Sequence, residues 1–373
     1  MDFSLTDDQR ALSDLAAQIL ADRCTLERLK AIESTDERYD RELWAQLAKA
    51  GLLGASLPES VGGSGGGFLE SCLLLEQQGR RVAMLPLLPT LVSAALPLVR
   101  FGSAEQQRCY LPGVVAGDTL LSAALTELNS DSRAPVTTAK RDGNGWRLDG
   151  VKVGVPMAHL AAAVLVPARI SDGQVGVFIV DPKASGIALA RQEAMNWETH
   201  FRMELSGVAV GSDALLGSTG HGAEILSWII DRTTTGLCAL AAGVCQEAVR
   251  LTAEYASNRK QFDQPIAMFQ AVGQRMADSF IDNEAVSLTM WQAASRLTDE
   301  MPSDKEIATA KYWASEGGSR IGHAALHIHG GISIDIDYPI HRYFLWVKQI
   351  EYTLGAATPQ LQRLGALIAA EPA

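Results

Sequence analysis

Apolar positions recur every three or four residues along the first part of the chain, and this spacing predicts amphipathic helices. The segment DDQRALSDLAAQILADR carries an apolar stripe at Leu12, Leu15, Ala16 and Leu20. A second amphipathic segment, DRELWAQLAKAGLLG, closes with glycines, which often end helices. The following GGSGGG lacks the Lys-Ser/Thr of a phosphate-binding loop and follows no strand, so we interpret it as a flexible connector.

Between residues 119 and 217 the pattern changes to short β-branched runs separated by Gly, Asp and Pro, which predicts strands. These runs are GWRLDGVKVGV, AAAVLVPARI, QVGVFIVDP, IALARQ and FRMELSGVAV. Long helical patterns return after them, one with Ser303 as its expected N-cap. The order predicts a helical domain over 1–118, a β-domain over 119–217 and a helical bundle over 218–373.

Composition and charge exclude several classes of protein. The net charge of -11 and the pI of about 5.2 argue against a nucleic-acid surface, which needs clustered Lys and Arg. No apolar run approaches the ~20 residues of a membrane span. The acidic, amphipathic MDFSLTDDQRALSDL is no secretory signal. The 5 cysteines are odd in number and show no CxxC, so we expect reduced thiols, a cytoplasmic protein and no zinc site.

Four separate stretches, in the right order, resemble signatures of the acyl-CoA dehydrogenase family. They are LWAQLAKAGLLGASLPESVGGSGGGFLE, FGSAEQQRCYLPGVVAGD, RKQFDQPIAMFQ and HGGISIDIDYPIHRYF. The resemblance runs nearly end to end and implies an N-terminal α-helical domain, a middle β-barrel and a C-terminal four-helix bundle. It also implies a reaction in which a glutamate removes the α-proton of an acyl-CoA thioester while FAD accepts the β-hydride.

The resemblance implies two segments that bind FAD. In the family, residues matching Arg259, Gln261, Phe262 and Gln270 reach across a dimer interface to the ADP half of the neighbouring subunit's FAD, and the planar fork of Arg suits a pyrophosphate. The remaining expected contacts are Phe269, His327, His329, Gly330 and Gly331.

Other roles are open for these residues. Arg259 could instead cap helix carbonyls or pair with Asp263, and His327 could be a satisfied histidine in a helix-end turn. Metal binding by His327 and His329 is not expected, because alternate residues on a helix point apart.

The catalytic base of the family has no counterpart here. Many relatives carry the glutamate at the position of Ala356, and others carry it at about Gly236, but a methyl group or a hydrogen accepts no proton. The nearby acids, Asp231, Glu224 and Glu351, lie off these positions. We therefore expect no catalytic residue in this chain.

The flavin-ring side also departs from the family. A W-[IV]-[ST] segment that grips the ring in relatives becomes Gly154-Val155-Pro156. A TEPxAGSD loop becomes TELNSDSRAP, which keeps Thr126 and Glu127, loses the glycines, and introduces Arg133. The losses thus fall on the chain's own flavin ring and on proton abstraction.

This pattern of losses resembles the noncatalytic β subunits of actinobacterial heterotetrameric steroid side-chain acyl-CoA dehydrogenases. Three stretches resemble the type that acts on 3-oxo-cholest-4-en-26-oyl-CoA: RYDRELW, QFDQPIAMFQAVGQRMADSFID and the closing HIHGGISIDIDYPIHRYFLWVKQIEYTLGAATPQLQRLGALIAAEPA. That resemblance implies a homologous catalytic α subunit in a tetramer of two α and two β chains, and an FAD shared at their interface. It also implies a cholesterol-derived steroid acyl-CoA as substrate and an electron-transferring flavoprotein as acceptor. Two other hypotheses stay open: a self-sufficient homomeric enzyme with Asp231 as a displaced base, and a flavin-free acyl-CoA-binding or scaffold protein.

Overall fold

The computed structural model describes residues 3–170 and 173–371 and divides the chain into two compact units. The helical unit contains the residues up to Ser34, Cys72–Ala83 and the chain from Thr234 on. The sheet unit contains Thr35–Ser71 and Met84–Thr233. The expected domains, 1–118, 119–217 and 218–373, divide the chain by the order of its elements along the sequence, whereas these two units group residues by contact in space. The three-domain division stays a prediction.

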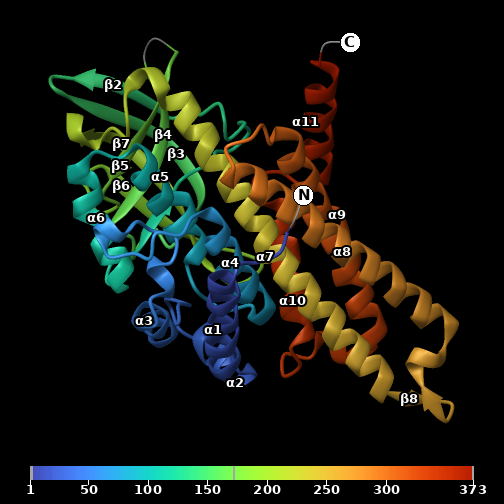
Figure 1. Ribbon diagram of the computed structural model, residues 1–373. Coiled ribbons are helices and arrows are strands. Elements are labelled where there is room, and N and C mark those ends of the chain that lie inside the picture. The colour runs from blue at the N-terminus through green and yellow to red at the C-terminus, as the bar shows by residue number, and fades with distance from the viewer. Residues whose placement is uncertain (1–2, 171–172, 372–373) are drawn as a thin grey trace. The chain divides into compact units, whose positions relative to one another are not determined.

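The first part of the chain is helical, as predicted (Figure 1). Its elements are α1 (Asp7–Arg23), α2 (Leu26–Glu33), α3 (Arg41–Lys49), η1 (Leu52–Gly54), η2 (Glu59–Val61), α4 (Phe68–Arg81), η3 (Leu88–Ala95), α5 (Leu96–Phe101) and α6 (Ala104–Ala116). Thr6 and Gln9 form a capping box at the start of α1. Helix α3 ends at Lys49, and Gly51 beyond it adopts the left-handed φ of 78°.

The glycine-rich stretch after η2 has a defined backbone, so its interpretation as a flexible connector was wrong. The four successive amides from Gly63 to Gly66 donate to carbonyl oxygens of residues 54–58. A Cβ on Gly63 would lie 2.1 Å from the carbonyl oxygen of Leu57, which explains why this approach requires glycine.

The sheet unit contains a seven-stranded sheet in the order β1-β4-β2-β3-β7-β6, with β5 also paired to β4. Its strands are β1 (Leu121–Ala123), β2 (Thr138–Asp142), β3 (Gly145–Pro156), β4 (Ala163–Ile170), β5 (Val175–Val180), β6 (Ile187–Glu193) and β7 (Thr199–Val210). Strands β1 and β2 run parallel to β4, and the other pairs are antiparallel. Within residues 3–170 and 173–371, β5 and β6 each pair with one strand, so the expected β-domain is an open sheet.

Alternate strand residues form the core of this unit. The rings of Trp146 and Phe178 meet edge to face there, with centroids 5.4 Å apart. The register of β3 against β7 shifts between Lys152 and Val155, where Gly154 adopts a φ of 61°. This bulge bends β3 at the segment that was expected to lack a flavin-ring wall.

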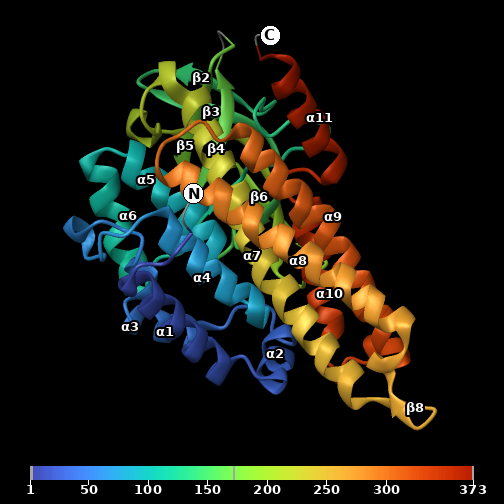
Figure 2. The same ribbon diagram turned by 45° about the vertical axis from the view of Figure 1, so that its right-hand side comes forward.

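The long C-terminal helices are confirmed as a bundle. The remaining elements are η4 (Ser212–Ala214), η5 (Thr219–His221), α7 (Gly222–Asn258), β8 (Lys260–Gln261), β9 (Gln264–Pro265), η6 (Ile266–Met268), α8 (Gln270–Thr298), α9 (Asp304–His329), η7 (Gly330–Ile334), α10 (Ile340–Tyr352) and α11 (Ala357–Ala369). Helix α8 lies along α9 in both ribbon views (Figures 1 and 2). Ser303 occupies the N-cap position of α9, but its side chain makes no capping hydrogen bond.

None of the helices in the described residues combines the length and the apolar character that a membrane crossing requires.

Candidate functional site

A two-stranded hairpin, β8–β9, joins α7 to α8 and carries part of the predicted cofactor set. Its turn residues, Phe262 and Asp263, have φ values of 52° and 64°, the left-handed values of a type I′ turn. Phe262 is 88% exposed, and its ring meets that of Phe269 edge to face, with centroids 6.2 Å apart. The hairpin projects beyond the ends of α7 and α8 (Figure 2).

Arg259, at the base of this hairpin, has an exposed guanidinium. This side chain makes no hydrogen bond or ion pair with any other residue that the structure describes. The alternative in which it pairs with Asp263 is therefore not what the structure shows. Its main chain is fixed instead: the amide donates to Tyr255 at 2.8 Å, and the carbonyl accepts from Ile266 at 2.8 Å. A fixed backbone with an unpaired guanidinium suits an anionic ligand.

The two glutamines of the predicted set also lie on the surface. Gln261 donates to the carbonyl of the adjacent Lys260 at 2.8 Å, and Gln270 begins α8 with an exposed side chain. Among the described residues, no side chain caps the start of α8. Its first amides are therefore directed out of the helix end, where negative charge is favoured.

The two histidines at the end of α9 lie in different environments. His327 is exposed, whereas His329 is 3% exposed and its Nδ1 lies 2.8 Å from the carbonyl oxygen of Ala325. Burial lowers the pKa of His329 below its ordinary value. The expectation that His329 contacts a cofactor stays a prediction, and the burial of the His329 side chain does not support that expectation. Gly330 follows with φ 65° and ψ -139°, a conformation that glycine adopts most readily.

Aromatic packing brings the two predicted segments together. Tyr255 lies one helical turn before Arg259, and its ring stacks on that of His329 with centroids 4.3 Å apart. The ring of Tyr338 lies 5.3 Å from that of His329. The base of the hairpin and the Gly330–Gly331 pair therefore flank one aromatic cluster. Sequence reasoning did not single out either tyrosine.

A shallow groove of about 450 Å³ runs between α8 and α9. It is lined by Arg275, Asp278, Ser279 and Asp282 from α8 and by Arg320, His323, Ala324 and His327 from α9. Arg320 binds both carboxylate oxygens of Asp282, at 2.8 and 2.5 Å. The side chain of Arg275 has no partner among the described residues, so it is an available cation beside His327. Sequence reasoning missed Arg275, although its spacing from residues 278, 279 and 282 marks one helix face.

A buried ion pair holds the loop between η7 and α10. Arg342 is 3% exposed, and its Nε and Nη2 each donate to the carboxylate of Glu33 on α2 at 2.7 Å. The same guanidinium donates to the carbonyl of Ile336 at 3.3 Å. Arg342 thus positions the loop that follows Gly330 and Gly331. The sequence motif contained this arginine but did not show that Glu33, 309 residues away, pairs with it.

The family positions for a catalytic glutamate hold no carboxylate. Ala356 forms the N-cap of α11, and Gly236 is buried within α7. The backbone before Ala356 is well anchored, because buried Lys311 donates to the carbonyls of Ile350 and Glu351 at 2.9 and 3.0 Å. Burial lowers the pKa of Lys311 to about 8. The turn at which many relatives carry the glutamate is therefore present and anchored, but the side chain at that position, Ala356, is a methyl group.

The other acids are engaged or exposed. The carboxylate of Glu351 pairs with Lys348 at 2.5 Å. Asp231 accepts a hydrogen bond from Arg133 at 2.5 Å, so the side chain of Arg133 is directed to α7. Glu224 lies exposed in the first turn of α7. None of these three carboxylates stands free beside the positions of Ala356 or Gly236.

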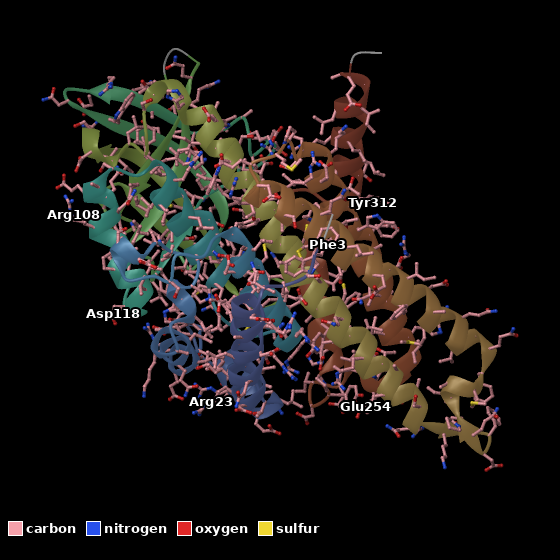
Figure 3. The ribbon with its side chains drawn as sticks, in the orientation of Figure 1. Phe3, Arg23, Arg108, Asp118, Glu254 and Tyr312 are labelled. Carbon is pink, nitrogen blue, oxygen red and sulfur yellow. The ribbon has the colours of Figure 1, made fainter. Side chains whose placement is uncertain are left out.

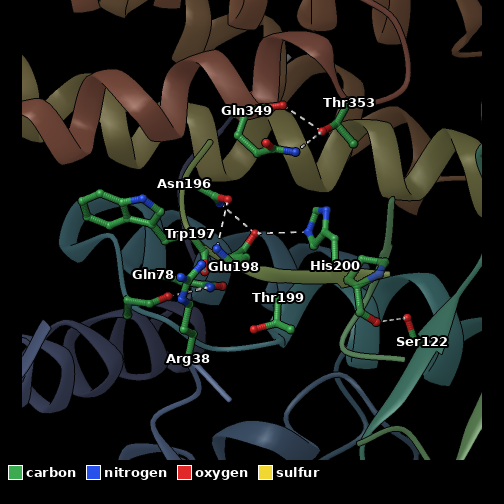
Figure 4. A network of polar contacts seen from close by, with 12 residues as sticks. Arg38, Gln78, Ser122, Asn196, Trp197, Glu198, Thr199, His200, Gln349 and Thr353 are labelled. Carbon is green, nitrogen blue, oxygen red and sulfur yellow. Dashed lines mark hydrogen bonds and ion pairs between the residues drawn. The ribbon is translucent and has the colours of Figure 1, made fainter. Parts of the chain in front are cut away.

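The segment Gly154–Pro156, which the resemblance aligns with the flavin-ring wall of relatives, has no indole and has ionisable neighbours. The amide of Gly154 donates to the side chain of Gln192 at 2.8 Å, and Pro156 pairs in register with His200. Figure 4 shows Glu198 between Asn196, at 2.8 Å, and His200, at 3.9 Å. Burial raises the pKa of Glu198 to about 7 and lowers the pKa of His200 to about 4. Sequence reasoning missed this pair.

Comparison with known proteins adds an independent finding. Residues 6–118 match the description "Acyl-CoA dehydrogenase, N-terminal domain", and residues 220–368 match "Acyl-CoA dehydrogenase, C-terminal domain". The chain is 39% identical to "Acyl-CoA dehydrogenase FadE27" of Mycobacterium tuberculosis, with 100% of both chains covered.

Two solved structures resemble the whole chain. A chain of the "ChsE4-ChsE5 complex from Mycobacterium tuberculosis" matches with a TM-score of 0.95 and 39% identity, and 100% of both chains is covered. A chain of a variant of the "Tcur3481-Tcur3483 steroid ACAD" matches with a TM-score of 0.91 and 45% identity, over 97% of this chain and 98% of the other.

Proposed function

Because the chain belongs to the acyl-CoA dehydrogenase family, we propose that it is the noncatalytic β subunit of a heteromeric, FAD-dependent member. One contrast carries this proposal. The guanidinium of Arg259, which suits the ADP half of FAD, is exposed and has no partner among the described residues, whereas Ala356 and Gly236 hold no base. A subunit that contributes to a neighbour's cofactor site, and that has no reaction of its own, accounts for both features.

The residues present fit one half of FAD. Arg259 and Gln270 would contact the pyrophosphate and its neighbouring oxygens, and Phe262 would offer an apolar face, with Gln261 and Phe269 beside it. The groove between α8 and α9 offers Arg275 and His327 as further polar contacts. FAD, when bound, would accept the substrate's hydride.

The isoalloxazine ring fits this chain less well. Gly154 provides no aromatic wall, and Pro156 has neither an amide hydrogen nor a hydroxyl group to donate. Burial lowers the pKa of His200, so the side chain that pairs in register with Pro156 is a neutral imidazole at neutral pH. We infer that the ring and the substrate's α-carbon lie in the partner subunit, whose carboxylate removes the proton.

The solved relatives support the partner and the substrate class. Each of the two structures is named for two different proteins, and one of them is called a steroid ACAD. By analogy, this chain would pair with a homologous catalytic α subunit in a tetramer of two α and two β chains, and would act on a cholesterol-derived steroid acyl-CoA. An electron-transferring flavoprotein would reoxidise the flavin.

Two other functions are disfavoured by specific contacts. A self-sufficient homomeric enzyme would need Asp231 as its base, but a carboxylate oxygen of Asp231 accepts from Arg133. A flavin-free scaffold would have no use for Arg259, an arginine whose backbone is fixed and whose charge has no partner in the part of the chain that the structure describes.

The proposal is tested by assaying α,β-dehydrogenation of acyl-CoA thioesters, steroid thioesters among them, with an artificial electron acceptor. The chain is assayed alone and after co-expression with homologous acyl-CoA dehydrogenases from its own genome. We expect turnover only with a partner. Turnover by the chain alone would favour the homomeric enzyme. A partner that turns over equally well with and without this chain would favour the scaffold.

A further inference from the structure

One face of helix α8 is mostly apolar and open to solvent. Its large members, Phe280, Ile281 and Leu288, are 57%, 62% and 53% exposed. Single exposed apolar side chains are ordinary, but a contiguous stripe of them marks an interaction surface. The members of this stripe recur every three or four residues and therefore share one side of the helix. We call it the α8 face, and it comprises Ala277, Phe280, Ile281, Glu284, Leu288 and Trp291.

Glu284 is the one charged member of the α8 face. The other charged residues between positions 277 and 291 are Asp278 and Asp282, and both line the groove towards α9 instead. The exposed carboxylate of Glu284 makes no hydrogen bond or ion pair with any residue that the structure describes. Glu284 lies midway between Phe280 and Leu288, so a protein that covers these two also covers the carboxylate. A covered carboxylate needs a cation beside it.

A second copy of this chain would fit the α8 face poorly. Two copies pair about a two-fold axis, which brings the same surface of each together. If the two helices run antiparallel and Phe280 meets Leu288 of the other copy, each Glu284 meets its own counterpart. If the helices run parallel, every residue meets its counterpart, and so does Glu284. In both arrangements two carboxylates would be covered together, and like charges in an interface weaken binding.

We propose that the α8 face binds an unlike chain, the homologous catalytic subunit, through a helix that places a Lys or Arg opposite Glu284. Apolar side chains of that helix would remove Phe280, Ile281 and Leu288 from water. Glu284 then determines which chain is bound, because it attracts the unlike chain and repels a second copy of its own. The identity of the bound chain rests on the noncatalytic role proposed above, whereas the selection by charge does not.

Mixing two charge variants of the full chain tests this selection without the catalytic subunit. Glu284→Lys reverses the charge at an exposed position, and lysine forms helices about as well as glutamate. We expect the parent chain to bind the Glu284→Lys chain about tenfold more tightly than either chain binds its own kind. Sedimentation of a labelled chain titrated with an unlabelled one measures these affinities. The gain should shrink at high salt, because salt screens the pair.

Two further variants show where the gain arises. Phe280→Ser added to the Glu284→Lys chain should abolish the gain, since the two chains would meet through the same face. Asp118→Lys is the matched control: Asp118 lies exposed in the sheet unit (Figure 3), and its side chain has no partner among the described residues. The Asp118→Lys chain should bind the parent no more tightly than the parent binds itself.

The complex with the catalytic subunit gives the second measurement. Glu284→Lys should weaken the binding of this chain to that subunit about tenfold, because a lysine would then face the Lys or Arg of the other helix. Asp118→Lys should leave this affinity unchanged. Unchanged affinity in Glu284→Lys would overturn the assignment of the catalytic subunit to the α8 face, and would leave the noncatalytic role as proposed.

The mixtures separate this proposal from the proposed function. Equal affinities for like and unlike pairs overturn the selection by Glu284, whatever reaction the chain takes part in. A parent chain that associates with itself, and that loses this association in Phe280→Ser, has a second copy on the α8 face and also overturns the proposal. Turnover by the chain alone overturns the noncatalytic role instead, and the mixtures of charge variants then still test the face.

Discussion

Replacing Glu33 with glutamine tests how the loop after Gly330 is positioned. The change removes the negative charge that Glu33 places against the guanidinium of Arg342, which is 3% exposed. Removing one partner of a buried ion pair costs about 3–5 kcal/mol. Glutamine keeps one acceptor oxygen, and Arg342 retains its bond to Ile336 at 3.3 Å, so we expect the lower end of that range, about 3 kcal/mol.

Hydrogen exchange of peptides spanning 330–343 in the full chain measures this loss. A loss of about 3 kcal/mol corresponds to exchange about a hundredfold faster. Lys30→Met is the control, because it breaks the exposed contact between Lys30 of α2 and Asp337 of the same loop but keeps the carboxylate of Asp337, which also interacts with Arg342. Exposed pairs contribute little, so the control should exchange like the parent. If the two variants behave alike, Arg342 does not hold this loop as we argue.

Three further outcomes are expected. Arg259→Ala should weaken flavin retention by the complex by about 1.5–3 kcal/mol, the value of a charged hydrogen bond, and unchanged flavin content under dilution would remove Arg259 from the site. Ala356→Glu should give the chain alone no activity, since Gly154 and Pro156 also depart from the family; measurable turnover would refute that reasoning. Between about pH 4.5 and 6.5 the folded chain holds a proton on Glu198, while the unfolded chain holds one on His200. Both states then bind one proton at this pair, so the pair adds no pH dependence to the free energy of unfolding. His200→Gln leaves only the raised pKa of Glu198, and the thermal midpoint should then fall as pH rises from about 5 to about 7, relative to the parent; a parallel profile for both proteins would contradict these assignments.

The sequence predicted those elements well whose own residues carry a clear local pattern. Strands β3 to β7 were expected from short β-branched runs separated by Gly, Asp and Pro, and helices α1, α7 and α9 from helical patterns, all within a few residues. Strand β2 was missed because its sequence, TAKRD, shows no alternation of β-branched residues, and its conformation depends on pairing with β3 and β4. Helix α10 was missed although Ile340, Tyr343, Val347 and Ile350 repeat at helical spacing and are all buried. Helix α8 begins at Gln270, six residues earlier than the expected segment, and Gly273 weakens the helical signal there.

The candidate site was predictable only in part, since its contacts join distant segments. The resemblance to a family pointed to Arg259 and Phe262 as cofactor contacts; both are exposed, and their role stays a prediction. The burial of His329 against Tyr255 follows from how α9 meets α7, which no local pattern encodes. The pairing of Arg133 with Asp231 spans 98 residues. Sequence reasoning noticed Arg133 as an intruding charge, and the structure supplied the partner that explains it.

The shared-cofactor account is tested most directly by flavin content per chain. Absorbance and mass are measured together for this chain expressed alone and for its complex with a homologous catalytic partner. The account predicts no bound flavin in the chain alone and one FAD for each pair of unlike chains in the complex. One flavin per chain in the protein alone would contradict it, because the ring side around Gly154 and Pro156 would then bind FAD unaided.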